Sequence, residues 1–229
     1  MNILIIGGTK GIGRETAVTL AQNTDNRILV TGRNSYSLNK LSGEFDNIST
    51  FQMDLSAFDS LATKFREVFQ SHFETVDILI NMAGLLVNRE FMDMDNTDAR
   101  LMMETNFFGP ASVIRMLKPY MKKGSHIVNI SSMGGFQGSS KYTGLSYYSA
   151  SKAAIASLSE CLAEEFRESG VSVNCLALGA INTEMLRDAF PGYNAPVESR
   201  DIATFISDFA TSGHKYFNGK ILPVALNNP

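Results

Sequence analysis

Cysteine and long hydrophobic runs are scarce in this chain, and their scarcity argues against several classes of protein. Only Cys161 and Cys175 occur among the 229 residues, and their spacing fits neither a metal site nor a redox motif. We therefore expect no disulfide framework and no metal site, and we expect both thiols to be buried. No apolar run approaches the roughly 18 residues that a membrane span requires.

The chain also lacks a strong charge of either sign. Lys and Arg number 20 against 23 Asp and Glu, which gives a net charge of -3. We therefore expect neither nucleic acid nor an anionic membrane as a partner. A strand-like segment begins directly after Met1 and Asn2, which leaves no room for a signal peptide and, with the two unpaired cysteines, favours a cytoplasmic location.

What the chain does have is enough apolar material for one sizeable core. Hydrophobic residues make up 44% of the sequence and charged residues 19%, which is typical of a globular protein. At roughly 100 to 200 residues per domain, this length predicts a single domain over residues 1–229.

Short apolar segments without two-residue alternation recur along the chain, with amphipathic segments between them. The expected strands are 2–6, 27–31, 49–53, 76–81, 126–131, 171–177 and 220–224. The expected helices are 13–22, 57–71, 97–122, 147–169 and 199–211. Continuous apolar strands are typical of a parallel sheet covered on both faces, so the pattern predicts a Rossmann-like, doubly wound α/β fold with a mostly seven-stranded parallel sheet.

A glycine-rich turn follows the first expected strand. Residues Gly7 to Gly13 read GGTKGIG and lead into a helix, whose free N–H groups and dipole suit a pyrophosphate. A tight strand-to-helix turn without a ligand accounts for these glycines equally well. Their spacing, Gly-x-x-x-Gly-x-Gly, resembles that of the short-chain dehydrogenase/reductase family.

Four further stretches resemble that family, in its order and at about its separations. Asn81-Met82-Ala83-Gly84 is similar to the family's Asn-Asn-Ala-Gly turn, and Tyr148 to Lys152 is similar to its tyrosine-lysine segment. Asn106 falls in the expected long helix, and Ser131-Ser132 ends the fifth strand. The resemblance implies an NADP(H)-dependent oxidoreductase that interconverts a carbonyl and a secondary alcohol, with a catalytic tetrad of Asn106, Ser132, Tyr148 and Lys152.

The spacing of Tyr148 and Lys152 supports acid–base chemistry independently. Residues four apart share a helix face, so an ammonium lies near a phenol. At about 4 Å and an effective dielectric of about 20 their coupling is roughly 4 kcal/mol, which is expected to lower the tyrosine pKa. The phenol then donates a proton to the oxygen of a carbonyl under reduction, and Ser132 holds that oxygen. The resemblance gives Lys152 a further bond to the nicotinamide ribose and gives Asn106 a bound water.

Each residue of the tetrad, taken singly, also fits a purely structural role. Asn106 can relieve a helix kink, Ser132 can satisfy a turn, and a tyrosine-lysine pair is often a surface pair. Tyr147 competes with Tyr148, although only Tyr148 has a lysine four positions on. The other candidate serines are Ser131, Ser139 and Ser140.

The second strand lacks the acidic residue that NAD-specific relatives have at its end. Arg33 stands there instead, and Lys10 lies in the glycine turn, so the resemblance implies NADP(H). Ordinary surface cations are the alternative. Asp54 resembles an adenine contact of the family or caps the next helix. The cofactor-binding residues implied by the resemblance are Gly7, Thr9, Lys10, Gly11, Ile12, Gly13, Arg33, Asp54, Leu55, Asn81, Ala83, Gly84, Tyr148, Lys152, Gly179, Ile181 and Thr183.

The substrate and the partners are less constrained. Met185, Leu186, Phe190, Pro191 and Tyr193 predict an apolar lid over a small-molecule substrate, or a lid that packs only on its own domain. The closest general resemblance is to 3-oxoacyl-[acyl-carrier-protein] reductases, so a carrier protein is a candidate partner. Lys118, Lys122 and Lys123 would meet its acidic surface, although a solvated lysine run at a helix end accounts for them better.

The long helices 97–122 and 147–169, together with the resemblance, predict a homotetramer or homodimer. The competing function for the chain is a noncatalytic NADP-binding redox sensor or scaffold, whose signature would be a broken tetrad. A related extended epimerase or dehydratase would need a larger C-terminal region.

Overall fold

A sheet of seven parallel strands forms the centre of the structure, a computed structural model that describes residues 1–226. Its strands are β1 (Asn2–Ile6), β2 (Arg27–Gly32), β3 (Ile48–Gln52), β4 (Val76–Asn81), β5 (Met121–Ser132), β6 (Ser172–Leu178) and β9 (Ile221–Val224). They lie in the order β3-β2-β1-β4-β5-β6-β9, and every adjacent pair is parallel. The predicted Rossmann-like, doubly wound fold is confirmed.

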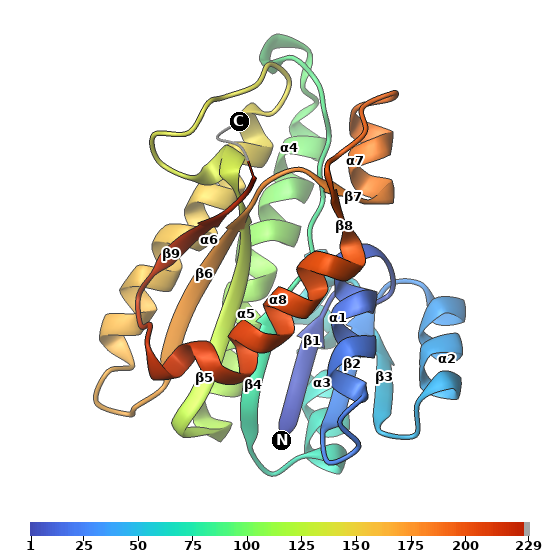
Figure 1. The fold of residues 1–229 in the computed structure, drawn as a ribbon, viewed down its shortest axis with the longest axis vertical. Helices are drawn as coiled ribbons and strands as arrows, with labels where there is room; N and C mark the ends of the chain where they lie inside the picture. Colours follow the sequence, from blue (N-terminus) through green and yellow to red (C-terminus); the bar gives the residue numbers. More distant parts are fainter. Residues whose placement is uncertain (227–229) are drawn as a thin grey trace.

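Helices cover both faces of this sheet (Figure 1). On one face lie α1 (Gly11–Ala21), α2 (Ser35–Glu44) and α8 (Ser199–Ser212); on the other lie α3 (Phe58–His72), α5 (Gly109–Leu117) and α6 (Ser146–Glu165). In β1, Ile3 and Ile5 enter the first core and Leu4 and Ile6 the second. Because both strand faces are buried, the apolar runs are continuous rather than alternating.

The long helix predicted over residues 97–122 is wrong. The structure divides it into α4 (Asn96–Met103), a π-helical turn (Glu104–Phe108), α5, and a 3₁₀ turn before β5. Gly109 packs against Leu55, where a Cβ would lie 2.5 Å from Leu55 Cγ. Pro110 follows in the first turn of α5, where its missing N–H is tolerated. The widened turn carries Asn106, so the interruption belongs to the site described below.

Four smaller elements escaped prediction. Helix α2 begins after Asn34, whose side-chain oxygen accepts a hydrogen bond from the Ser37 N–H at 2.9 Å. Helix α7 (Glu184–Ala189) lies between β7 (Ile181–Asn182) and β8 (Val197–Glu198), which pair as a two-stranded parallel ladder. The last three elements lie at the carboxyl end of the main sheet, the upper end in Figure 1.

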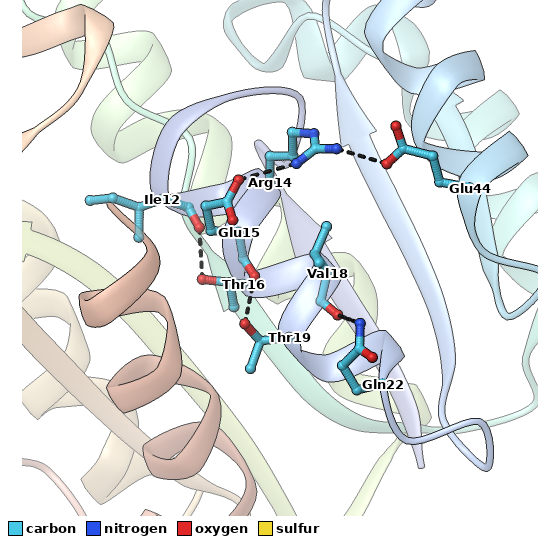
Figure 2. Close-up of polar contacts among 8 residues, drawn as sticks. All are labelled: Ile12, Arg14, Glu15, Thr16, Val18, Thr19, Gln22 and Glu44. Carbon is cyan, nitrogen blue, oxygen red and sulfur yellow. Dashed lines mark hydrogen bonds and ion pairs between the residues drawn. The ribbon is translucent and has the colours of Figure 1, made fainter. Parts of the chain in front are cut away.

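Helix α1 is anchored by its own side chains (Figure 2). Thr16 donates to the Ile12 carbonyl at 2.8 Å, one turn back. Arg14 reaches the carboxylates of Glu15, at 3.1 Å, and Glu44 of α2, at 2.7 Å. This cation is therefore held by two acids on the surface and lies outside the lining of the cleft described below.

The two cysteines differ in their exposure. Burial of both cysteines is wrong: Cys175 is buried in β6, whereas Cys161 is exposed on α6. Across residues 1–226, no helix has the length and apolar character needed to cross a membrane.

Strand β9 forms one edge of the sheet, and its Pro223 pairs in register with Ala177.

Candidate active site

A cavity of about 460 Å³ lies at the carboxyl ends of the strands. This position follows from the topology, because the chain proceeds outward from β1 to β3 and then returns to β4 on the other side of β1. The two connections leave in opposite directions and open a crevice between them, where ligands bind in open α/β sheets.

The glycine turn lines this cleft, and three of its glycines have no room for a side chain. A Cβ at Gly13 would lie 2.0 Å from the Gly7 carbonyl oxygen, and one at Gly7 would lie 2.5 Å from Ala83 Cα. At Gly8 it would lie 2.4 Å from Val30 Cγ1. These glycines let the backbone of the turn approach β2, the start of α1 and the turn after β4.

The first turn of α1 presents unpaired donors to the cleft. Lys10 is the N-cap residue, its side chain makes no capping bond, and the first turn contains no acidic residue. The first backbone hydrogen bond of the helix runs from Arg14 N to Lys10 O. The N–H groups of Gly11, Ile12 and Gly13 therefore have no acceptor within the helix. This positive helix end suits an anionic group such as a pyrophosphate.

Two cations lie at the corner where the glycine turn meets β2. Thr9 packs against Gly32, where a Cβ would lie 2.3 Å from Thr9 Cγ2, so their neighbours Lys10 and Arg33 line the same side of the cleft. Arg33 is exposed. Lys10 forms an ion pair with Glu184 of α7, with Nζ and Oε2 2.9 Å apart.

The other residues predicted to bind cofactor nearly all line the cleft. Asp54 caps a 3₁₀ turn through Ser56, as the capping alternative predicts, and also borders the cavity. Asn81 is the exception: it is buried behind the lining and donates to Asn129 at 2.7 Å. Those in the lining are Gly7, Thr9, Lys10, Gly11, Ile12, Gly13, Arg33, Asp54, Leu55, Ala83, Gly84, Tyr148, Lys152, Gly179, Ile181 and Thr183.

Tyr148, Ser132 and Lys152 meet at the middle of the cleft. Tyr148 and Lys152 project from the first turns of α6, and Ser132 ends β5. The lysine Nζ lies 6.0 Å from the centre of the tyrosine ring and donates to the Ile130 carbonyl at 2.9 Å. The end of β5 thus supplies both the serine and the acceptor that holds the lysine.

The expected lowering of the Tyr148 pKa is wrong. Burial raises the pKa of Tyr148, and a hydrogen bond with Ser132 only partly opposes the rise. Burial also lowers the pKa of Lys152 to about 8, with Cys175 acting in the opposite direction. Burial removes water from both groups and so disfavours both charged forms, the phenolate and the ammonium. The ammonium also faces the Ile130 carbonyl and the tyrosine ring, so its charge does not act on the tyrosine hydroxyl alone. The phenol is therefore protonated at neutral pH, ready to donate.

Asn106 lies in the π-helical turn and not in the lining of the cleft. Its side-chain oxygen accepts from Leu85 N at 2.7 Å, and its amide donates to Leu85 O and to Ser151 Oγ, both at 2.9 Å. A Cβ at Gly84 would lie 3.7 Å from this oxygen and 3.4 Å from Lys152 Nζ. Asn106 therefore ties the turn after β4 to α6 close to the lysine.

The competing tyrosine and serines have contacts of their own. Tyr147 stacks on Phe91, with ring centres 5.7 Å apart and planes 10° apart, and it does not line the cavity. Ser131 borders the cleft but donates to the Lys152 carbonyl at 2.6 Å. Ser139 donates to the carbonyls of Met133 and Phe136, and Ser140 is exposed outside the lining.

The outer part of the cleft is formed by apolar side chains from three segments. The predicted lid contributes Met185, Leu186, Phe190 and Tyr193, whereas Pro191 lies outside the lining. Four more residues of this wall come from the turn after β4 and from the segment between β5 and α6: Leu86, Met133, Tyr142 and Leu145. Among the described residues, the cations of the lining are Lys10, Arg33 and Lys152, so none belongs to this apolar wall.

The lysines considered for a carrier protein lie at the opposite end of the sheet. Lys122 and Lys123 belong to the first residues of β5, at its amino end, and Lys118 precedes them. Lys122 pairs with Asp77 at 3.4 Å, and the Lys118 ammonium lies 4.8 Å from the centre of the Phe166 ring. A partner bound to these lysines would sit far from the cleft.

The fold and the cleft define a Rossmann-like α/β protein with a candidate dinucleotide-binding site. Residues 1–194 match the short chain dehydrogenase family, and the chain belongs to that family. An uncharacterized oxidoreductase of Staphylococcus saprophyticus is 30% identical over 206 residues, which cover 87% of this chain and 86% of that protein. The mouse dehydrogenase/reductase SDR family member 7B is 33% identical over 193 residues, covering 80% of this chain and 58% of that protein.

Solved structures give the same assignment. The structure of ElxO with NADP bound has a TM-score of 0.83 at 26% identity, and the match covers 98% of this chain and 96% of that one. A protein described as a candidate betaketoacyl-ACP reductase has a TM-score of 0.82 at 25% identity, with the same coverage. The protein is thus an oxidoreductase of the short chain dehydrogenase family.

Proposed function

We propose that this protein is an NADPH-dependent ketoreductase that interconverts an apolar carbonyl compound and its secondary alcohol, within a single domain over residues 1–229. The observation that carries the proposal is the meeting of Tyr148, Ser132 and Lys152 in one cleft with an uncapped helix end and two cations. Tyr148, Ser132 and Lys152 supply acid–base chemistry, and the helix end with its two cations supplies an anion-binding site beside them.

The residues present fit a dinucleotide. The glycine turn leaves a cradle that side chains would fill, and α1 offers three N–H groups that have no acceptor among residues 1–226. Gly7 to Gly13 would hold the pyrophosphate, and Asp54 and Leu55 would border the adenine. Thr183, Gly179 and Ile181 would border the nicotinamide. Bound NADPH supplies a hydride to the carbonyl carbon.

Residues of the protein itself transfer a proton to the carbonyl oxygen. Tyr148, whose pKa burial raises, gives its hydroxyl proton to the carbonyl oxygen as negative charge develops there. Ser132 donates to the same oxygen and orients it. Lys152, charged at neutral pH with a pKa of about 8, stabilises the phenolate that remains. Asn106 fixes the backbone beside Lys152. We also propose that Asn106 binds a water through which Tyr148 regains its proton.

The end of β2 supports NADPH over NADH as the cofactor. Gly32 and Arg33 offer no carboxylate to a ribose hydroxyl, and the exposed Arg33 guanidinium suits a 2′-phosphate. The relative ElxO, whose structure contains NADP, is consistent with this choice.

The outer wall of the cleft favours an uncharged, apolar substrate. Its lining comes from leucine, methionine and aromatic side chains and contains no cation, among the described residues, to pair with a carboxylate or phosphate. A 3-oxoacyl thioester meets this requirement, and the similarity to a candidate betaketoacyl-ACP reductase supports testing it. A carrier protein, if one delivers the substrate, would approach from the carboxyl end of the sheet.

We further propose a homo-oligomer assembled through the α4–α5 and α6 side of the molecule. Leu101 of α4 and Phe108 of the π-helical turn expose 37% and 49% of their surface there. Light scattering at micromolar concentration is expected to give a dimer or tetramer, and a stable monomer of 25.1 kDa would refute this part of the proposal.

The test of the proposed function is NADPH oxidation, followed by absorbance, against a panel of aliphatic ketones, aromatic ketones and 3-oxoacyl thioesters. We expect turnover of at least one apolar ketone or thioester by wild type, and a rate about 10² to 10⁴ lower with Tyr148→Phe. Tight NADPH binding with no turnover across the panel would instead support the noncatalytic sensor or scaffold.

A further inference from the structure

Helix α7 is tied to the body of the protein on both sides of the cleft. At its start, Glu184 pairs with Lys10 of the glycine turn, and at its end the Ala189 carbonyl accepts from Asn88 at 2.8 Å. The second contact is neutral. The first is an ion pair whose two side chains remain 58% and 56% exposed, so solvent and other ions reach both.

The Lys10–Glu184 contact is well defined. The Glu184 carboxylate has a lowered pKa because Lys10 donates a hydrogen bond to it and adds a favourable charge. Gly11, next to Lys10, faces the residue before Glu184: a Cβ there would lie 3.5 Å from Thr183 Cγ2. The glycine turn and the start of α7 therefore meet where the anion site opens.

Lys10 thus lies between an acceptor and the proposed phosphate site. On one side is the Glu184 carboxylate; on the other is the corner where Thr9 contacts Gly32 and Arg33 lines the cleft. A phosphate bound at Arg33 would attract Lys10 as well, but one ammonium that turns to the phosphate gives up much of its bond with the carboxylate.

We propose that Glu184 is a specificity-determining residue that weakens the preference for NADPH over NADH by competing with the 2′-phosphate for Lys10. The inference rests on the proposed function, which assigns that phosphate to Arg33 and Lys10. NADH has no 2′-phosphate, so its binding leaves the ion pair intact. When NADPH binds, Lys10 must leave Glu184 to contact the 2′-phosphate. Part of the binding free energy gained from the phosphate is therefore lost.

The size of the effect is modest because both side chains are exposed. Solvent-exposed ion pairs contribute little, so the exchange is expected to change affinity by about two- to fivefold. Glu184→Gln keeps the size of the side chain and removes the competing charge. It should therefore tighten NADPH binding two- to fivefold and leave NADH binding unchanged.

The experiment is a fluorescence titration of NADPH and NADH into wild type, Glu184→Gln and a matched control, Asp188→Asn. Asp188 is an exposed acid one turn further along α7 that forms no ion pair with the described residues. The control removes the same unit of charge from the same helix. We expect Asp188→Asn to leave both affinities at their wild-type values.

A second pair of variants separates competition for Lys10 from direct repulsion of the phosphate. In a Lys10→Met background, Glu184→Gln should no longer change NADPH affinity, because there is no ammonium to release. The inference is overturned if the gain persists in that background, if Asp188→Asn reproduces it, or if NADPH and NADH change equally.

The wild-type affinities also separate this inference from the function on which it rests. Equal wild-type affinities for NADPH and NADH would overturn the proposed cofactor and this inference together. A wild-type preference for NADPH that Glu184→Gln leaves unchanged would overturn the inference alone.

Discussion

Each end of the central sheet has a buried basic side chain, Lys152 of α6 at the carboxyl end of β5 and His126 of β5 itself toward the amino end. At the carboxyl end, Lys152 donates to the Ile130 carbonyl and faces the cleft with Tyr148. At the amino end, His126 is bonded on both ring nitrogens, through Nδ1 to the Ala210 carbonyl at 2.9 Å and through Nε2 to Asn174 at 3.0 Å. Burial lowers the pKa of both groups, to about 8 for the lysine and about 4 for the histidine.

The difference lies in what the two bases can still reach. The imidazole has both ring nitrogens occupied, so its burial serves the packing of β5 against α8. The ammonium retains donors and borders a cavity, so its burial serves chemistry. A perturbed pKa therefore identifies a functional residue only when the group also faces open space.

Removing the acid at the carboxyl end should have the largest effect. Tyr148→Phe deletes the proton donor and no predicted phosphate contact, so ketone reduction should fall by about 10² to 10⁴ while NADPH affinity stays near wild type. Steady-state rates and cofactor titration measure the two effects. Tyr147→Phe is the matched control and should remain active; an inactive Tyr147 variant beside an active Tyr148 variant would show that the tetrad has been assigned one residue out of register.

The amino end should respond to acid through stability rather than activity. Below pH 6.5 the unfolded chain protonates His126, whereas the folded chain resists protonation until about pH 4. The free energy of unfolding should therefore fall by about 3 kcal/mol as the pH drops from 6.5 to 4, with no contribution from this group above 6.5. Denaturant unfolding across this range measures it.

A pair of histidine variants isolates this contribution from that of the carboxylates. His126→Gln should be less stable at pH 7 but should lose less stability on acidification than wild type. His72→Gln, outside the core, should keep the wild-type slope. Identical slopes for wild type and His126→Gln would assign the acid sensitivity to other groups, beginning with His214, whose ring centre lies 5.5 Å from that of His126.

The cofactor corner of the carboxyl end should show an intermediate effect. Arg33→Ala removes a charge-assisted contact of about 1.5 to 3 kcal/mol, so NADPH should weaken roughly ten- to a hundredfold and NADH hardly at all. Raised salt should narrow the wild-type preference, because Arg33 is exposed. Titration of both cofactors checks this, and an unchanged ratio in the variant would remove Arg33 from the site.

Charge removal at the amino end should have the smallest effect. Lys118→Gln, Lys122→Gln and Lys123→Gln, separately or together, should change reduction of a carrier-bound thioester less than twofold, because these lysines lie far from the cleft. Lys122→Gln also breaks the exposed pair with Asp77, at a cost below about 1 kcal/mol in stability. A loss of activity with carrier-bound substrate but not with a free thioester would instead show that a carrier protein docks at the amino end of the sheet.

The sheet could be predicted well because each strand is specified locally. The bounds of β1 and β4 match the prediction, since an apolar run between polar turns has one way to sit in a sheet buried on both faces. The glycine turn was equally readable, because backbone contacts such as Gly13 against Gly7 permit no other residue type.

Several of the features that escaped prediction depend on contacts between distant residues, although Gly109-Pro110 is a local signal of the break in the predicted long helix. The break at Asn106 reflects bonds to Leu85 and Ser151, 21 and 45 positions away. Leu86 and Leu145 share a wall of the cleft only because the turn after β4 meets the segment before α6. The Lys10–Glu184 pair joins residues 174 positions apart.

The edge strand β9 has a consequence for how the protein behaves in concentrated solution. The Lys220 carbonyl accepts from Cys175 of β6, and the Val224 carbonyl accepts from Gly179 directly after β6. The peptide groups one residue out of phase, including that of Pro223, therefore point away from the sheet. Proline has no N–H, and the outward row of donors is therefore interrupted near its middle. An eighth strand from another molecule would find an incomplete template, so the sheet ends at seven strands and open-ended strand-by-strand polymerisation from this edge is disfavoured.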